Sequence, residues 1–292
     1  MIVGAPFGRV EGSVEPVAVG ATAGVDELDH DVLEVAVGNP AFVRRFLAAQ
    51  AQKVQDLLDK IVVLPRITGP HQPAVQVANL LLRWCVAAKC THLLRILPPH
   101  QTADFSRDVD RRIMRAFCDI NDVNEQFGEM QRRLYETPTT WGGLGFRPLY
   151  DVRNAAYIGA WLQCIAHLRD AYGYAIPHFD DGWDRSGGTV YGFHSAFRDA
   201  LAALDGELGE PGGAFGELGY GVADTLRAEK TKAQKQLSRA VLAKRFTVWR
   251  DALDSASRPR LVLQMASAES RRSLASAWLV SPPMSDRTTI PD

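Results

Sequence analysis

Two short groups of side chains in this sequence have the residue types that bind metal ions. Cys85, Cys90 and His92 offer thiolate and imidazole ligands, but zinc sites pair such ligands and need a second pair to complete a tetrahedron. His178-Phe-Asp-Asp181 offers carboxylates for two-metal phosphoryl transfer, yet a Gly- and Asp-rich stretch follows it where apolar strand residues should flank the pair. We therefore interpret the first group as buried apolar cysteines and the second as a solvated acidic turn, and we predict no metal site.

Glycine and serine motifs give no catalytic candidate either. The sequence has no phosphate loop ending in Gly-Lys-Ser/Thr and no Gly-x-Ser-x-Gly signature. Gly142-Gly-Leu-Gly145 is too short for a dinucleotide fingerprint, and Pro148 would obstruct the helix that a pyrophosphate requires, so we interpret it as a turn. We predict no catalytic residue, no cofactor and no enzyme activity, while a constellation dispersed along the sequence stays open.

A basic segment between residues 227 and 250 is the best candidate for a functional surface. Its cations recur along one predicted helix, where they could neutralise phosphates and release counterions, and Glu229 is the only acidic residue before Asp251. The alternative is an ordinary solvated helix face. The candidate nucleic-acid-binding residues are Arg227, Lys230, Lys232, Lys235, Arg239, Lys244 and Arg245.

Composition restricts the class of protein without identifying it. The 292 residues carry a formal charge of -1, so binding to a polyanion would need a local patch rather than a global attraction. The four cysteines lie far apart, which favours buried free thiols over a disulfide framework. No segment is long and apolar enough for a signal peptide or a membrane span, and we expect an intracellular protein of the cytoplasm or nucleus.

Helical spacing of apolar residues dominates the chain and predicts a mainly α fold, a helical bundle or array. Asn39 and Pro40 begin a helix that Pro65 and Gly69-Pro70 should end. A second helix from about Pro73 to Val86 is apolar nearly all round, which suits the middle of a bundle. The predicted division is 1–38 an irregular or short-strand lead-in, 39–176 a helical domain, 177–223 a Gly/Asp-rich linker or insertion around a short helix at 193–204, 224–281 a C-terminal helical segment and 282–292 a tail.

Several sequence blocks occur together in a recognisable order. They are Val3-Gly-Ala-Pro-Phe-Gly8, Gly38-Asn-Pro-Ala-Phe-Val-Arg-Arg-Phe-Leu47, Leu80-Leu-Leu-Arg-Trp-Cys85, His92-Leu-Leu-Arg-Ile-Leu-Pro-Pro99, Trp141-Gly-Gly-Leu-Gly-Phe146 with Ala155-Ala-Tyr-Ile-Gly159, and Gln236-Leu-Ser-Arg-Ala240 with Ala277-Trp278. In this order the sequence resembles the region that follows the polymerase palm in reverse-transcriptase-like proteins of eukaryotic non-LTR retrotransposons. The resemblance covers most of residues 38–283, but residues 165–232 match nothing in the family.

The resemblance implies a helical thumb or connection region whose catalytic carboxylates would lie in a palm upstream of the Gly-Ala-Pro block. We therefore expect a non-catalytic fragment that contacts an RNA or DNA backbone, with a separate palm or another protein as a further partner. About thirty residues separate the first two blocks, which are nearly contiguous in the family. The alternative is an all-α protein-protein interaction scaffold with no role in nucleic-acid binding. Oligomeric state cannot be predicted from the sequence.

Overall fold

The computed structural model describes residues 30–32, 35–37, 39–68, 72–123, 129–141, 143–172, 192–209, 212–217 and 232–252. Most of this part of the chain is helical, which confirms the predicted mainly α class. The helices are α1 (Pro40–Thr68), α2 (Gln72–Leu81), the π-helix η2 (Leu82–Val86), α3 (Ala87–Ile96), α4 (Pro99–Asn121), α5 (Glu129–Glu136), the 3-10 helix η3 (Thr139–Trp141), α6 (Leu149–Tyr172), α8 (Gly192–Leu208), α9 (Gly213–Glu217) and α11 (Ala233–Ala252).

A small antiparallel hairpin lies in the segment predicted as an irregular or short-strand lead-in. Strands β1 (His30–Val32) and β2 (Val35–Val37) pair with Val32 opposite Val35 and His30 opposite Val37.

The predicted start of the first helix is confirmed, because the Oδ1 of Asn39 accepts hydrogen bonds from the backbone N–H groups of Ala41 and Phe42, at 2.9 and 3.0 Å.

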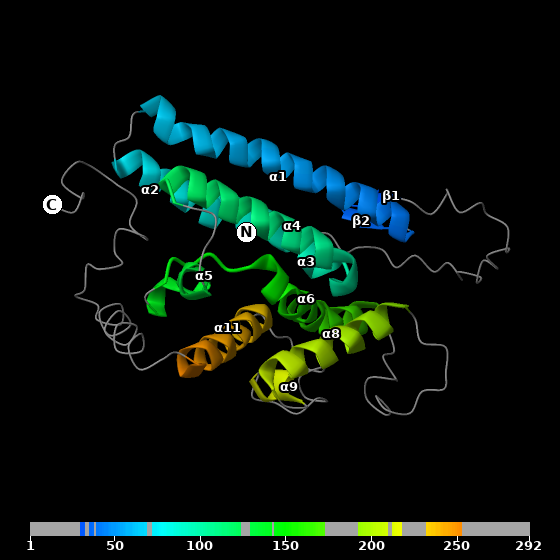
Figure 1. Cartoon of the computed structure of the whole chain (residues 1–292). Coiled ribbons are helices and arrows are strands. Elements are labelled where there is room, and N and C mark those ends of the chain that lie inside the picture. The colour runs from blue at the N-terminus through cyan, green and yellow to red at the C-terminus, as the bar shows by residue number, and fades with distance from the viewer. Residues whose placement is uncertain are drawn as a thin grey trace, which may run out of the picture.

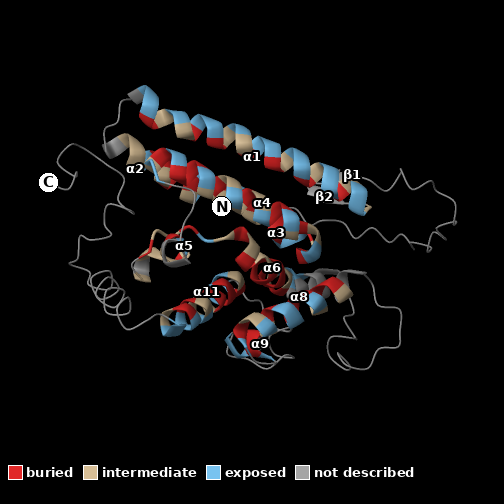
Figure 2. Ribbon diagram, in the orientation of Figure 1, coloured by how far each residue is buried: buried red, intermediate tan, exposed pale blue. Residues whose placement is uncertain are grey.

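The helices form layers on either side of α6 (Figure 1). The long helices α1 and α4 pack side by side in one layer with α2 and α3, while α8, α9 and α11 lie on the opposite side. Helix α6 packs against α3 and α4 through one face and against α8 and α11 through the other. Its side chains are buried nearly all round in its first three turns (Figure 2), as expected for a helix between two layers.

Two apolar clusters therefore meet at α6. The first joins α1, α2, η2, α3 and α4 with Val152 and Ala156 of α6. The second joins Tyr157, Ile158 and Leu162 of α6 with buried residues of α8, α9 and α11. The predicted C-terminal helical segment contains α11, whose buried residues include Ala233, Leu237, Val241, Leu242, Phe246 and Trp249.

Two predictions about the early helices are wrong. Pro65 does not end α1, because a proline in the last turn removes a hydrogen bond only near the helix end, and its ring is buried. The helix ends at Thr68, directly before Gly69-Pro70, which agrees with the other half of that prediction. The apolar helix predicted from Pro73 to Val86 does not lie in the middle of the bundle. Trp84 and Cys85 are exposed, and α6 takes the central place.

The segment predicted as a linker contains structured elements. The predicted short helix is confirmed as α8, whose Phe197, Ala200 and Leu204 are buried in the second cluster, and α9 packs beside it. Residues 177–191 and 218–223 of this segment lie outside the described residues, as do 253–292. The predicted division into domains stays a prediction. None of the described helices is both long and apolar enough to cross a bilayer.

Candidate nucleic-acid interface

Helix α11 places the predicted basic residues on different sides of the molecule. Lys232, Lys235, Arg239 and Lys244 are exposed, and the first three lie on one face of the helix by their spacing. Arg245 is half-buried and pairs with Asp151 of α6, with Nη1 and Oδ2 2.5 Å apart. Arg227 and Lys230 lie outside the described residues. The structure therefore separates Arg245 from the exposed basic face.

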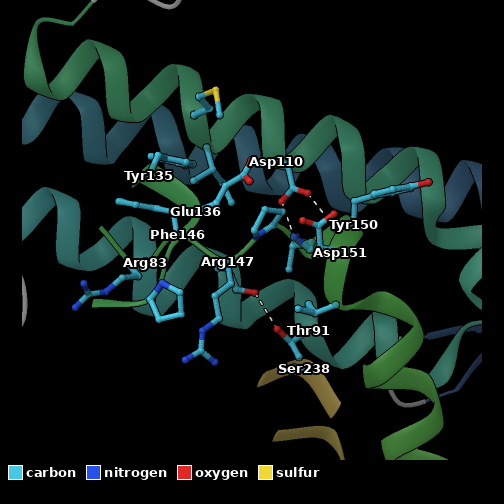
Figure 3. Close-up of a pocket in the computed structure, with 18 of the residues that line it drawn as sticks. Arg83, Thr91, Asp110, Tyr135, Glu136, Phe146, Arg147, Tyr150, Asp151 and Ser238 are labelled. Carbon is cyan, nitrogen blue, oxygen red and sulfur yellow. Dashed lines mark hydrogen bonds between the residues drawn. The ribbon is translucent and has the colours of Figure 1, made fainter. Parts of the chain in front are cut away.

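A groove of about 1370 Å³ opens where Arg245 lies, between η2, α3, α4, α5, the loop before α6, and α11 (Figure 3). Seven arginines and four carboxyl groups line this groove, a surplus of three positive charges. The arginines are Arg83, Arg107, Arg111, Arg132, Arg133, Arg147 and Arg245, and the carboxyl groups are Asp104, Asp110, Glu136 and Asp151. Arg107, Arg111, Arg132 and Arg147 are exposed, so the groove is open to solvent-borne ligands.

Carboxylates neutralise several of these arginines. Arg107 pairs with Asp104 at 3.1 Å, Arg133 with Glu136 at 3.3 Å, and Arg245 with Asp151. Arg111 pairs at 3.3 Å with Asp108, which does not line the groove. The pairs of Arg107 and Arg111 are exposed and therefore weak, whereas those of Arg133 and Arg245 are partly buried. The groove therefore combines structural ion pairs with cations that an anionic ligand can reach.

Arg83 and Arg147 form no ion pair with a carboxylate in the described part of the chain. The Nη1 of Arg83 donates to the backbone carbonyl of Leu144 at 3.2 Å, and its guanidinium carbon lies 5.0 Å from the centre of the Trp84 ring. Burial, and then the neighbouring charge of Arg147, lower the pKa of Arg83 below its usual value. Two guanidinium groups that repel each other without a carboxylate between them favour binding of an anion such as a phosphate.

The glycine-dense loop places Arg147 in the groove. Its backbone folds back on α5, with the N–H of Leu144 donating to Leu134, at 2.9 Å, and the N–H of Phe146 to Tyr135, at 3.1 Å. Gly145 has a φ of +78° and its Cα lies so close to Arg83 that a Cβ would be 3.3 Å from Cδ of that side chain. The prediction of a turn here is confirmed, and the turn fixes the spacing between η2 and Arg147.

Tyr150 forms the wall of the groove next to α4. The guanidinium carbon of Arg107 lies 4.1 Å from the centre of its ring, and that of Arg153 lies 3.7 Å from it. Arg107 also donates from Nη2 to the hydroxyl oxygen, at 2.6 Å. The ring therefore places the Arg107 guanidinium at the α4 side of the groove, while Arg153 of α6 contacts the same ring without lining the groove.

Three largely buried carboxyl groups, of Asp110, Glu136 and Asp151, line the groove. Asp110 of α4 accepts hydrogen bonds from the backbone N–H groups of Leu149 and Tyr150, at 2.8 and 3.0 Å, and so caps α6 from another helix. Burial raises the pKa of Asp110 to about 7, against the opposing effect of these hydrogen bonds. Burial also raises the pKa values of Glu136 and Asp151, which Arg133 and Arg245 partly offset. Asp110 therefore joins α4 to the start of α6, and Asp151 joins α6 to α11.

The cysteine and histidine predictions have mixed outcomes. All four cysteines are free thiols, as predicted, but only Cys90 and Cys118 are buried. The prediction was wrong for Cys85 and Cys164, which are exposed, because in the described part of the chain each lies on the solvent-facing side of its helix, which apolar spacing alone does not identify. His92 is exposed, and its Nδ1 lies 2.6 Å from the Lys89 carbonyl oxygen. Within the described residues no three His, Cys, Asp or Glu side chains gather as a metal site would require, and residues 178–181 lie outside that part.

The arginine groove itself was missed by the sequence prediction, apart from Arg245. Its other arginines come from η2, α4, α5 and the glycine loop, one or two from each, so no single segment looks strongly basic. Two features of the sequence could have indicated the groove. Arg132 and Arg133 are adjacent, and Arg147 directly follows the Gly-Leu-Gly-Phe turn. Comparison of the chain with known protein families, with curated proteins and with solved structures finds no match.

Proposed function

We propose that this chain is a non-catalytic helical protein that binds the sugar-phosphate backbone of RNA or DNA, as expected from its resemblance to the post-palm region of retrotransposon reverse transcriptases. The observation that carries the proposal is the arginine groove, in which seven guanidinium groups face four carboxyl groups. Guanidinium groups match phosphate oxygens with two parallel hydrogen bonds, so a surplus of arginines in an open groove favours a chain of phosphates.

The exposed face of α11 supports the same function as a second contact. Lys232, Lys235 and Arg239 make no ion pair within the described residues, and Gln234 and Ser238 of the same helix line the groove. A backbone that leaves the groove past α11 would therefore meet further cations. The groove and this face are distinct surfaces, so mutations can test them separately.

The test measures binding of fluorescent RNA and DNA oligonucleotides as a function of salt concentration. We expect binding at about 50 mM salt, with a logarithmic slope of roughly 0.7 to 0.9 for each phosphate neutralised. The variant R132Q/R147Q should weaken binding and reduce the slope. Its matched control, R44Q/R45Q, removes two exposed arginines of α1 that do not line the groove and should leave both unchanged.

A second variant, K232Q/K235Q/R239Q, tests the α11 face in the same assay. A loss of affinity would assign this face to the interface as the sequence predicts, and unchanged affinity would restrict the interface to the groove. The proposal fails if the folded protein binds neither nucleic acid at about 50 mM salt, or if R44Q/R45Q weakens binding as much as R132Q/R147Q. The interaction scaffold would then be the better hypothesis.

A further inference from the structure

The π-helix η2 presents an aromatic side chain to solvent at the arginine groove. Trp84 is 51% exposed and is the one aromatic residue among the large apolar side chains that the described structure leaves exposed. It lines the groove beside Arg83. A π-helical turn within a longer helix is rare and frequently marks a functional site. An exposed indole has no role in the apolar clusters, so it is available to a ligand.

Arg83 lies beside this indole, and Arg147 lies close enough to Arg83 for their charges to interact. The Arg83 guanidinium lies over the Trp84 ring, and Figure 3 shows Arg83 and Arg147 extending toward the same edge of the groove, away from Asp110. The Leu144 carbonyl and the close approach of Gly145 hold Arg83, while Arg147 follows two residues later in the same loop. This part of the groove therefore contains two cations, Arg83 and Arg147, and the aromatic surface of Trp84.

We propose that Arg83, Trp84 and Arg147 form a binding site for an unpaired nucleotide, with its phosphate between the two guanidinium groups and its base against the indole. This inference rests on the proposed nucleic-acid binding and adds the class of substrate, a single strand. In a duplex the bases stack on one another and their faces are closed to protein side chains, whereas an unpaired base can stack on an aromatic ring. The site thus selects single strands over duplexes.

Stacking and phosphate contacts have different experimental signatures. Stacking on Trp84 contributes affinity that does not depend on salt, and its loss on alanine substitution should weaken binding by about 5-fold to 100-fold. A phosphate contact from Arg147 contributes to the salt slope, so R147Q should lower the slope for a single strand by about 0.7. The two side chains can therefore be tested with the same oligonucleotide.

The experiment compares a single-stranded RNA oligonucleotide with the duplex of the same sequence, by fluorescence anisotropy with the full chain. We expect the wild type to bind the single strand more tightly. W84A should remove most of that preference with an unchanged salt slope, and W84F should retain part of it because phenyl rings also stack with bases. The matched control is I96A, which truncates a side chain of α3 that is 50% exposed and does not line the groove.

Thermal unfolding of W84A checks that the fold persists, and W84F tests stacking with a smaller change if it does not. The inference is overturned if W84A binds the single strand as tightly as I96A does, or if W84A weakens single-strand and duplex binding equally. Either result leaves the proposed backbone binding intact. If the wild type binds neither oligonucleotide, the proposed function itself has failed.

Discussion

Single side chains in this protein serve two purposes at once, and Asp110 is the clearest case. Its carboxylate caps α6 from α4 through the N–H groups of Leu149 and Tyr150, and it lines the arginine groove. The same burial that makes these hydrogen bonds well protected opposes the charge, so the pKa rises to about 7. Protonation of Asp110 therefore couples the stability of the groove to pH.

The D110N variant should reveal this coupling. Because the pKa of Asp110 is about 7 in the folded protein and near 4 in an unfolded chain, the folded state binds more protons between those values. The stability that Asp110 contributes is then present at low pH and lost as the pH rises toward about 8. Asparagine cannot ionise in this range, so the variant lacks this contribution.

Urea unfolding of both proteins at about pH 5 and about pH 8 measures the effect. We expect the free energy of unfolding of the wild type, relative to that of D110N, to fall by about 2.5 kcal/mol from about pH 5 to about pH 8. Titrating groups far from Asp110 contribute equally to the two proteins and cancel in the difference, whereas Glu136 and Asp151, whose charges help to raise the pKa of Asp110, belong to the measured effect. An equal difference at both pH values would show that Asp110 ionises at its ordinary pKa in the folded state.

Between elements, the close approach of α6 and α11 depends on one glycine. A Cβ at Gly159 would lie 2.6 Å from the Cα of Gln234, and backbone atoms of α11 cannot rotate out of the way as a flexible side chain can. Since Gln234 and Ser238 line the groove, the position of α11 set by Gly159 also determines the width of the groove. Packing and the candidate site are linked at this contact.

The G159A variant should lower the free energy of unfolding by about 1 to 3 kcal/mol, because the added methyl group forces the helices apart. G206A is the matched control on α8, where a Cβ would meet nothing within 4 Å. There alanine should stabilise the helix by up to about 1 kcal/mol through its higher propensity. Chemical denaturation of the two variants measures both, and a G159A variant as stable as G206A would contradict the close contact.

The helices could be predicted from the sequence because their apolar spacing is local. The start of α1 at Asn39, the short helix that the structure has as α8 and the C-terminal helix α11 all follow from residues within one helix, and the structure has them as expected. The central position of α6 could not be predicted in the same way. The surroundings of α6 depend on which other helices pack against it, and this is not visible in its own sequence. The apolar helix predicted from Pro73 to Val86 was therefore the more obvious candidate for the centre of the bundle.

The groove depends on contacts between residues far apart in the sequence. Arg83 reaches the loop through the carbonyl of Leu144, 61 residues away, and Asp110 caps a helix that begins 39 residues later. Sequence reasoning found one dense basic segment, whereas the structure gathers single arginines from several elements. Charge density along the sequence is therefore a poor guide to charge density in space.

At the scale of the whole molecule, α6 makes the two apolar clusters dependent on each other. Val152 and Ala156 belong to the first cluster, and Tyr157, Ile158 and Leu162 belong to the second, so neighbouring residues of one helix face both layers. If the second cluster opens, α6 loses the packing on one side and cannot keep its place against α3 and α4. We therefore expect the described layers to unfold together.

The L204A variant tests this dependence. Leu204 of α8 is fully buried in the second cluster, so the truncation should lower the free energy of unfolding by about 2 to 5 kcal/mol. Hydrogen exchange of the core amides should then accelerate by the same factor in α1 and α4 as in α8, although α1 and α4 belong to the first cluster. V241A, in the same cluster on α11, should give the same pattern. If exchange accelerates in α8 and α11 while α1 and α4 keep their protection, the two layers are separate cooperative units, and α6 joins them without transmitting stability.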